Sequence, residues 1–276
     1  MASATGLRWR YIVAGILSTL LYRVFGLRRS VIRDNIARSF PELTEGDRGR
    51  VIREHARRQG EVAAESWYSL GMSADELRER VTVADVERLR SFVAPNRPVV
   101  LAGAHQANWE WMSLRLSLEF GSAYLALYKP PHNTRVESFL VRLRTRFGGR
   151  LTPAKSILKE LANFRQAAAI AMLADQAPRS SPERHWTRFL NQDTAFFMGA
   201  ELLGRALRTQ VLFVSMRRLE RGRYAVDFEP LNTPGEKVEQ GAISERYARA
   251  LERCIRNDPP GWLWSHRRWK LRRPSA

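Results

Sequence analysis

The chain is poor in cysteine and contains none of the common metal or nucleotide motifs. Its 276 residues include one cysteine, Cys254, which excludes an internal disulfide and is typical of a reducing compartment. No cysteine–histidine cluster has zinc spacing, and no glycine-rich loop has the pattern that cradles a phosphate. The sequence therefore predicts neither a metal site nor a bound cofactor.

The N-terminal region lacks a hydrophobic run long enough to span a bilayer. Residues 11–22 carry no charge, but twelve residues are too few for a spanning helix. Arg23 follows directly, where a secretory signal peptide needs small residues for cleavage. Flanking arginines and the aromatic residues Trp9, Tyr11 and Tyr22 suit the boundary between headgroups and acyl chains. We expect a membrane-associated interfacial helix over residues 1–29, with an ordinary buried helix as the alternative.

Acidic residues are scarce relative to basic residues. The chain has 28 Asp and Glu against 46 Lys and Arg, a formal net charge of +18, and the basic excess is spread along the sequence. Such a charge favours an anionic partner, and nucleic acid, an anionic bilayer and an acidic protein all qualify. A nucleic-acid-binding protein is therefore an open alternative, although no nucleic-acid-binding motif is present.

Apolar runs that alternate with amphipathic segments predict an α/β fold. Strands are expected at 99–102, 122–127, 167–174, 211–216 and 224–228. Helices are expected at 45–70, 112–120, 134–147, 154–164, 194–207 and 235–256, with one or two more over 73–92. Residues 178–192 are polar, which predicts an irregular loop over a site. The alternation predicts a single layered domain over residues 30–276, with a mostly parallel central sheet flanked by helices. Sites in such sheets gather at the carboxyl ends of strands, where His105 and Asp175 both fall.

His105 and Glu110 form the most informative motif, because they follow the first of these apolar runs. On one continuous helix, side chains five positions apart would point about 140° from each other, since each residue turns about 100°. They can meet only if His105 lies in the turn and Glu110 in the helix that follows. This arrangement predicts a general base whose imidazole is oriented by a carboxylate. The alternative is a structural histidine near a helix start.

This motif and its context resemble the bacterial lipid A biosynthesis acyltransferases, the late lauroyl/myristoyl transferase family. That family carries an H-x4-[DE] motif, often with Asn-Trp before the acid, and here Asn108 and Trp109 precede Glu110. Four further blocks are similar to the family's and stand in the same order. The first is Asn35 with residues 40–42, and the second is residues 128–130 together with Asn133, Arg144 and Gly148. The third is Asp175 with Gln176, and the fourth is residues 255–270. Five ordered blocks are far more specific than one motif.

The resemblance implies a glycerolipid acyltransferase-like fold and a defined reaction. A fatty acyl chain would pass from acyl carrier protein or acyl-CoA, as donor substrate and without a further cofactor, to a hydroxyl of a glycolipid such as a lipid A precursor. His105 would be the general base, Glu110 its orienting carboxylate, and Arg144 would face the oxyanion. Substrate contacts are expected from Asn108, Lys129, Asn133, Asp175, Gln176, Arg267, Arg268 and Lys270. A helix cap is the alternative for Asn108. Asp175 could hydrogen-bond a residue of the catalytic site or cap the next element, and a solvated surface position is the alternative for the basic residues.

The resemblance also implies the cytoplasmic face of the inner membrane, with peripheral or monotopic attachment. The charge of +18 would serve both an anionic lipid surface and an acidic acyl carrier protein, and no nucleic acid is expected as a partner. The chain departs from the family between Gln176 and Phe197, where the family's Phe-Phe-Gly segment has no clear counterpart, and this leaves the acceptor open. An inactive acyltransferase-like scaffold is the remaining alternative.

Overall fold

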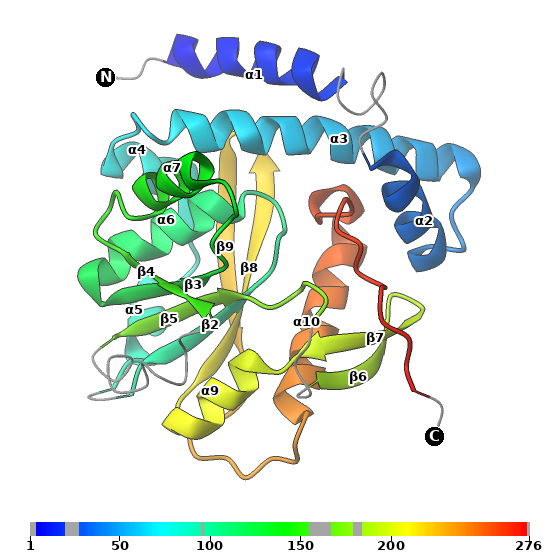
Figure 1. Ribbon diagram of the computed structural model, residues 1–276. Helices are drawn as coiled ribbons and strands as arrows, with labels where there is room; N and C mark the ends of the chain where they lie inside the picture. Colours follow the sequence, from blue (N-terminus) through cyan, green and yellow to red (C-terminus); the bar gives the residue numbers. More distant parts are fainter. Residues whose placement is uncertain (1–3, 20–27, 95–96, 155–166, 179–183, 275–276) are drawn as a thin grey trace.

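A mixed β-sheet forms the centre of the computed structural model, which describes residues 4–19, 28–94, 97–154, 167–178 and 184–274 (Figure 1). Within these ranges the sheet has seven strands in the order β1-β9-β8-β2-β5-β3-β4. Their bounds are β1 Val81–Val83, β9 Arg223–Pro230, β8 Val211–Glu220, β2 Val99–Gly103, β5 Ala169–Leu173, β3 Tyr124–Tyr128 and β4 Arg150–Pro153. Neighbouring strands are parallel except for the antiparallel pair β8 and β9. The expected α/β fold with a mostly parallel sheet is confirmed.

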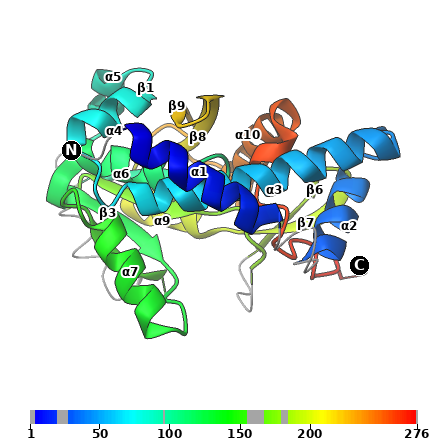
Figure 2. The ribbon, with the colours of Figure 1, turned by 90° about the horizontal axis from the view of Figure 1, so that it is seen from above.

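Helices cover both faces of the sheet (Figures 1 and 2). The described helices are α1 Ala4–Thr19, α2 Arg29–Ser39, α3 Glu45–Tyr68, α4 Ala74–Arg80, α5 Val86–Ser91, α6 Trp109–Phe120, α7 Thr134–Arg144, α9 Gly199–Leu207 and α10 Ala242–Asn257. One buried cluster joins the sheet to α4, α5, α6 and α7, and the other joins it to α2, α9 and α10. Successive residues of β2 belong to alternate clusters, which explains why this strand is a continuous apolar run.

The register of β2 and β5 places the residues that follow them side by side. The two strands are parallel, with Gly103 opposite Leu173, and the backbone N–H of Ala174 donates to the Gly103 carbonyl at 3.1 Å. His105 and Asp175 each lie two residues beyond this pair. Sheet order therefore brings these side chains to the same edge, although they are 70 positions apart in sequence.

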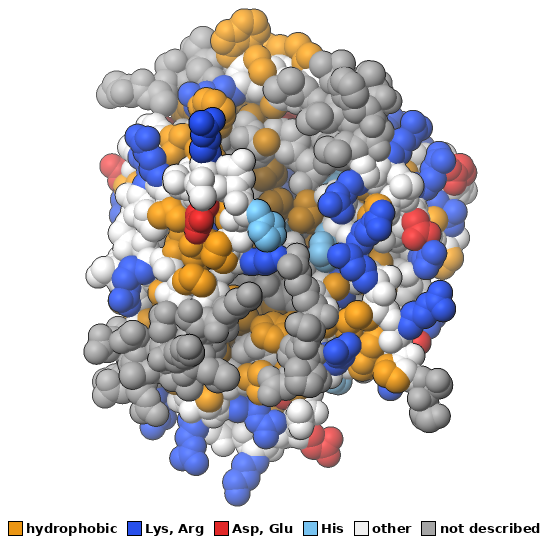
Figure 3. Space-filling model, viewed as in Figure 1, with side chains coloured by type: hydrophobic (Ala, Val, Ile, Leu, Met, Phe, Trp, Pro, Cys, Tyr) orange, Lys and Arg blue, Asp and Glu red, His pale blue; other side chains and the backbone are white. Residues whose placement is uncertain are grey.

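Helix α1 packs on the outer side of α3, above it in Figure 1 and crossing over it at an angle in Figure 2. Hydrophobic side chains gather over α1 at the upper edge of the molecule (Figure 3), and Trp9 is 67% exposed, with Ile12, Val13 and Ile16 also exposed. No helix within the described ranges combines the length and the apolar character needed to cross a membrane. Residues 20–27, which include the end of the uncharged leader, lie outside the described residues.

Several expectations on local structure were wrong. The segment 178–192 is not an irregular loop where it is described, because β6 Arg184–Phe189 and β7 Gln192–Phe197 form an antiparallel hairpin. Its turn residues Leu190 and Asn191 have φ of 47° and 63°, so the turn has left-handed residues without the glycine that usually marks it. Because β7 extends to Phe197, α9 begins later than expected, at Gly199; α10 also begins later, at Ala242. The short strands β1 and β4 were not expected, and the helix expected at 154–164 falls almost wholly outside the described residues.

Candidate active site

His105 lies in a tight turn between β2 and α6. Ala107 has φ 51°, a left-handed conformation that costs a non-glycine residue about 1 kcal/mol. The segment after α10 holds this turn, since the Ala107 N–H donates to the Gly261 carbonyl at 2.9 Å and the Leu263 N–H donates to the His105 carbonyl at 3.0 Å. Backbone hydrogen bonds to Gly261 and Leu263, far along the chain, therefore fix the turn that carries the imidazole.

Asp175 holds the His105 side chain. Its Oδ1 lies 2.7 Å from His105 Nδ1, and its Oδ2 accepts from the His105 backbone N–H at 3.0 Å and from Trp262 Nε1 at 2.8 Å. Burial alone would raise the pKa of Asp175, but the His105 charge and these hydrogen bonds lower it to about 2. An ionised carboxylate only accepts hydrogen bonds, so Nδ1 carries the proton and Nε2 of the neutral ring is left to act as a base.

Glu110 does not hold His105, and that expectation is corrected. Its carboxylate accepts two hydrogen bonds from Arg144, Nε to Oε2 at 2.8 Å and Nη2 to Oε1 at 2.6 Å. Burial would lower the pKa of Arg144, but hydrogen bonds and charge from Glu110 outweigh burial and raise it. The prediction from H-x4-E paired the wrong carboxylate, because the neighbour of β2 in the sheet brings Asp175 closer.

A cavity of about 440 Å³ opens beside His105. Its polar lining consists of His105, Glu110, Ser113, Tyr124, Tyr128, Lys129, Arg144 and Gln176. Its apolar lining includes Leu101, Met112, Leu116, Ala126, Leu151, Leu173, Phe197 and Val214. The Gln176 amide nitrogen lies 3.3 Å from His105 Nε2, on the side of the ring away from Asp175. A basic nitrogen, a fixed cation and apolar walls thus share one cavity.

Sequence comparison identifies the family. Residues 3–271 match the sequence profile described as "Bacterial lipid A biosynthesis acyltransferase". The chain belongs to this family. It is similar to the lipid A biosynthesis palmitoleoyltransferase of Escherichia coli (strain K12), 23% identical over 249 residues that cover 89% of this chain and 79% of the relative. It is also similar to the lauroyltransferase of the same organism, 23% identical over 265 residues, which are 93% of this chain and 83% of the relative. The protein is therefore an acyltransferase, as its sequence motifs predicted.

Three of the expected substrate-binding residues have other roles in this acyltransferase. Asn108 is fully buried and caps α6, since its Oδ1 accepts from the Trp111 N–H at 3.0 Å. Asn133 caps α7 and does not line the cavity. Arg268 is buried on the Phe196 ring, and burial lowers its pKa to about 10. These observations give the three side chains structural roles, and their expected contacts with substrate stay predictions.

The other expected residues divide by location. Lys129 and Gln176 line the cavity, whereas Arg267 and Lys270 are exposed on the C-terminal segment and do not. Asp175 is buried, is bonded to His105 and is not among the residues that line the cavity, so its expected contact with substrate stays a prediction. Arginines stand at positions 142, 144 and 146, and of these three Arg144 lines the cavity. Arg142 is exposed, and Arg146 donates to the backbone carbonyls of residues 70 and 72.

Two residues beside His105 and Asp175 were not among the expected site residues. Trp262 donates to Asp175 through Nε1 at 2.8 Å. His266 accepts from the Ala177 N–H at 3.3 Å, and burial lowers its pKa to about 4. Both belong to residues 255–270, the last of the blocks that resemble the family. That resemblance is the signal in the sequence that could have identified them.

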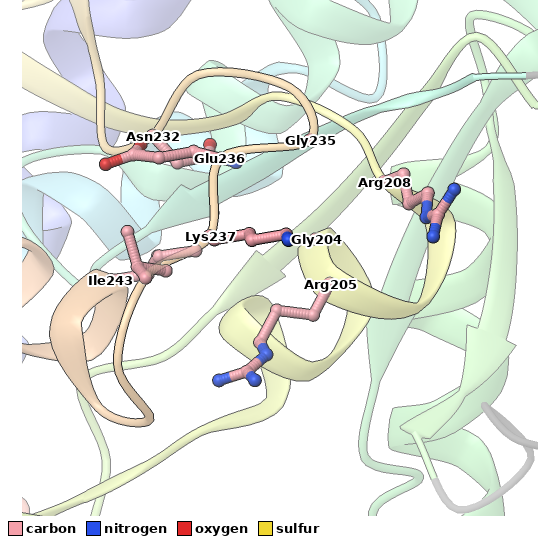
Figure 4. A pocket seen from close by; sticks show the side chains of 9 residues that line it. Gly204, Arg205, Arg208, Asn232, Gly235, Glu236, Lys237 and Ile243 are labelled. Atoms are coloured by element: carbon pink, nitrogen blue, oxygen red, sulfur yellow. The ribbon is translucent and has the colours of Figure 1, made fainter.

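A second cavity of about 480 Å³ lies between α9 and the segment before α10 (Figure 4). Lys237 extends towards Gly204, while Arg205 and Arg208 point in different directions. These cations do not converge on one point, so the cavity does not form an anion site. No group of three or more metal-ligating side chains occurs in the part of the chain that the structure describes.

Proposed function

We propose that this acyltransferase moves a fatty acyl chain from an acyl thioester to a hydroxyl of a lipid A precursor. The observation that carries the proposal is the His105 ring, fixed through Nδ1 by Asp175 at a cavity with apolar walls. The relatives named for palmitoleoyl and lauroyl transfer in lipid A biosynthesis support the acceptor class and a fatty acyl donor. Acyl carrier protein and coenzyme A are the two proposed carriers.

His105 would act as the general base in a direct transfer. Nε2 takes the proton of the acceptor hydroxyl while the hydroxyl oxygen attacks the thioester carbonyl carbon, which forms a tetrahedral oxyanion. Collapse of this intermediate forms the ester, breaks the C–S bond, and the imidazolium returns the proton to the departing thiolate. Asp175 stabilises the imidazolium during these steps, in the way that a buried carboxylate does in other His–Asp pairs.

Arg144 would stabilise the developing oxyanion. A preorganised donor at such a position contributes about 3 kcal/mol to transition-state stabilisation. The two hydrogen bonds to Glu110 use Nε and Nη2 of the guanidinium and fix its plane at the cavity wall. The proposed role of Glu110 is therefore to position Arg144. The acceptor hydroxyl would displace the Gln176 amide, which approaches His105 Nε2.

The outer face of α1 would contact an anionic bilayer. Trp9, Ile12, Val13 and Ile16 recur at helical spacing and form one exposed apolar stripe. A stripe of this kind with an interfacial tryptophan suits the boundary of a bilayer, and the net charge of +18 favours anionic headgroups. We propose peripheral or monotopic attachment to the cytoplasmic face of the inner membrane. The same charge would attract an acidic acyl carrier protein.

Product analysis tests the proposed reaction. The purified full-length protein is incubated with acyl-carrier or acyl-CoA donors of several chain lengths, together with a lipid A precursor on anionic vesicles. Mass spectrometry is expected to show an acceptor heavier by one acyl group in place of a hydroxyl hydrogen. Absence of any acylated lipid with every donor, from folded and vesicle-bound protein, would overturn the proposal. Binding of duplex DNA in place of vesicles would favour the nucleic-acid alternative.

A further inference from the structure

Helix α1 has a second face that points into the protein. Leu7 and Ala14 are buried on it, and Tyr11 lies between them at helical spacing, opposite the exposed apolar stripe. The Tyr11 hydroxyl donates to Glu65 Oε1 on α3 at 2.6 Å, and Arg221 lies over the Tyr11 ring at 5.2 Å. The helix that we propose to contact lipid is thus also hydrogen-bonded to a buried residue of α3.

Glu65 is a fully buried carboxylate that collects donors from three elements. Besides Tyr11 of α1, its Oε2 accepts from Asn108 Nδ2 at 2.6 Å and from the Tyr224 hydroxyl of β9 at 2.7 Å. The Trp111 indole also donates to the Glu65 backbone carbonyl at 3.0 Å. No ion pair to Glu65 occurs among the described residues. Burying a carboxylate is costly, and hydrogen bonds from each side offset that cost. Removing one donor should therefore disturb the others.

Asn108 connects this carboxylate to the catalytic turn. Its Oδ1 caps α6 through the Trp111 N–H, while its Nδ2 is held by Glu65, so both ends of the side-chain amide are fixed. Asn108 stands between His105 and Glu110, directly after the left-handed Ala107. A small displacement of the Asn108 side chain would therefore move the backbone that carries both the base and the residue that holds Arg144.

We propose that Glu65 is a positioning residue of the active site, and that seating of α1 on α3 through Tyr11 completes the hydrogen-bond set that fixes the His105 turn. The inference rests on the proposed role of His105 as general base. It makes α1 part of the catalytic machinery as well as a contact with lipid, because the outer face of the same helix is the apolar stripe. An enzyme with α1 seated would have its base in place for turnover.

Tyr11→Phe tests the contact, and Tyr68→Phe is its matched control. Phenylalanine keeps the ring and removes only the hydroxyl. Tyr68 lies on α3 and likewise donates to a glutamate, Glu76 on α4, at 2.6 Å. We expect Tyr11→Phe to lower kcat roughly 3- to 30-fold, the range for positions that act through a network. KM for the acyl donor and the unfolding temperature should match those of Tyr68→Phe. Equal kcat in the two variants would overturn the proposal.

A pair of variants tests Glu65 itself. In Glu65→Gln, the carbonyl oxygen can keep the two donors on Oε2, Asn108 and Tyr224, and the amide N–H then faces the Tyr11 hydroxyl, which can accept. Glu65→Met removes both acceptors and keeps the length of the side chain. We expect Glu65→Met to lower kcat more than Glu65→Gln does. Equal kcat in the two folded variants would contradict the proposed link.

Histidine NMR separates this inference from the proposed function. The chain contains five histidines, and the ring signals of His105 are assigned by their loss in His105→Ala. We expect Tyr11→Phe, but not Tyr68→Phe, to shift these signals, whether or not an acylated product is found. Unchanged His105 signals in Tyr11→Phe would refute the positioning role. A wild-type enzyme without product, but with the expected shift, would refute the proposed reaction alone.

Discussion

Replacing Asp175 with asparagine changes the orientation of His105, the proposed base, while keeping the shape of the side chain at 175. The wild-type carboxylate faces His105 Nδ1 with one oxygen and accepts two N–H groups, from the His105 backbone and Trp262, with the other. In the variant, the carbonyl oxygen can keep the two N–H donors, which places the amide N–H opposite Nδ1. Nδ1 must then accept, so the ring proton moves to Nε2, and a protonated Nε2 cannot take a proton from an alcohol.

The expected loss is large because the change removes the reactive tautomer. In Ser–His–Asp enzymes the same substitution lowers kcat about 10⁴-fold with the geometry intact. We expect a decrease of about 10³- to 10⁴-fold here, which corresponds to about 4–5 kcal/mol at 1.36 kcal/mol per decade. Transfer at saturating donor and acceptor, followed by mass spectrometry, measures kcat, and KM should change little.

Asp193→Asn is the matched control for this variant, since Asp193 is an exposed aspartate on β7. Circular dichroism and the unfolding temperature of Asp175→Asn establish that it is folded. A folded Asp175→Asn enzyme that keeps more than about a tenth of the wild-type kcat would refute the tautomer argument, because one decade is only 1.36 kcal/mol.

Two further predictions concern the arginine and acid stability. Arg144→Lys removes the planar pairing with Glu110 and should lower kcat about 10²-fold, whereas Arg142→Lys on the exposed side of α7 should not; equal activities would contradict the assigned position. Burial lowers the pKa of His55 and of His266 from 6.5 to about 4, so the unfolded chain binds protons there that the folded chain does not. The free energy of unfolding should fall as the pH decreases from 6.5 towards 4, by at most about 1.4 kcal/mol per pH unit for each histidine. Urea denaturation at stepped pH measures this slope. An equally steep slope in His55→Gln would show that His55 does not contribute to the pH dependence.

The strand, turn and helix that carry His105 could be predicted from local sequence. The apolar run before it predicts a strand buried on both faces, and the amphipathic residues after it predict α6. The carboxyl end of β5 was also placed correctly, with Asp175 after it. Local sequence patterns thus determine where each strand or helix lies and which residues follow it along the chain.

The partner of His105 could not be predicted in the same way. Glu110 is close in sequence, but the pairing of β2 with β5 brings Asp175 to the imidazole, and strand order is a property of the whole sheet. Strands β1 and β4 have only three and four residues and lie at the sheet edges, so pairing with β9 and β3 defines them. Arg268 looked like a ligand for a headgroup because the sequence does not reveal that Phe196 and the β7 backbone cover it.

The central claim is that the Nε2 atom of His105 activates the acceptor hydroxyl for direct transfer. The most direct measurement is single-turnover transfer by His105→Ala, compared with wild type at equal unfolding temperature and equal vesicle binding. We expect no lipid product and no acyl group left on the protein in the variant, with the thioester donor recovered intact. Product formation by folded His105→Ala at a rate near that of wild type would contradict the mechanism.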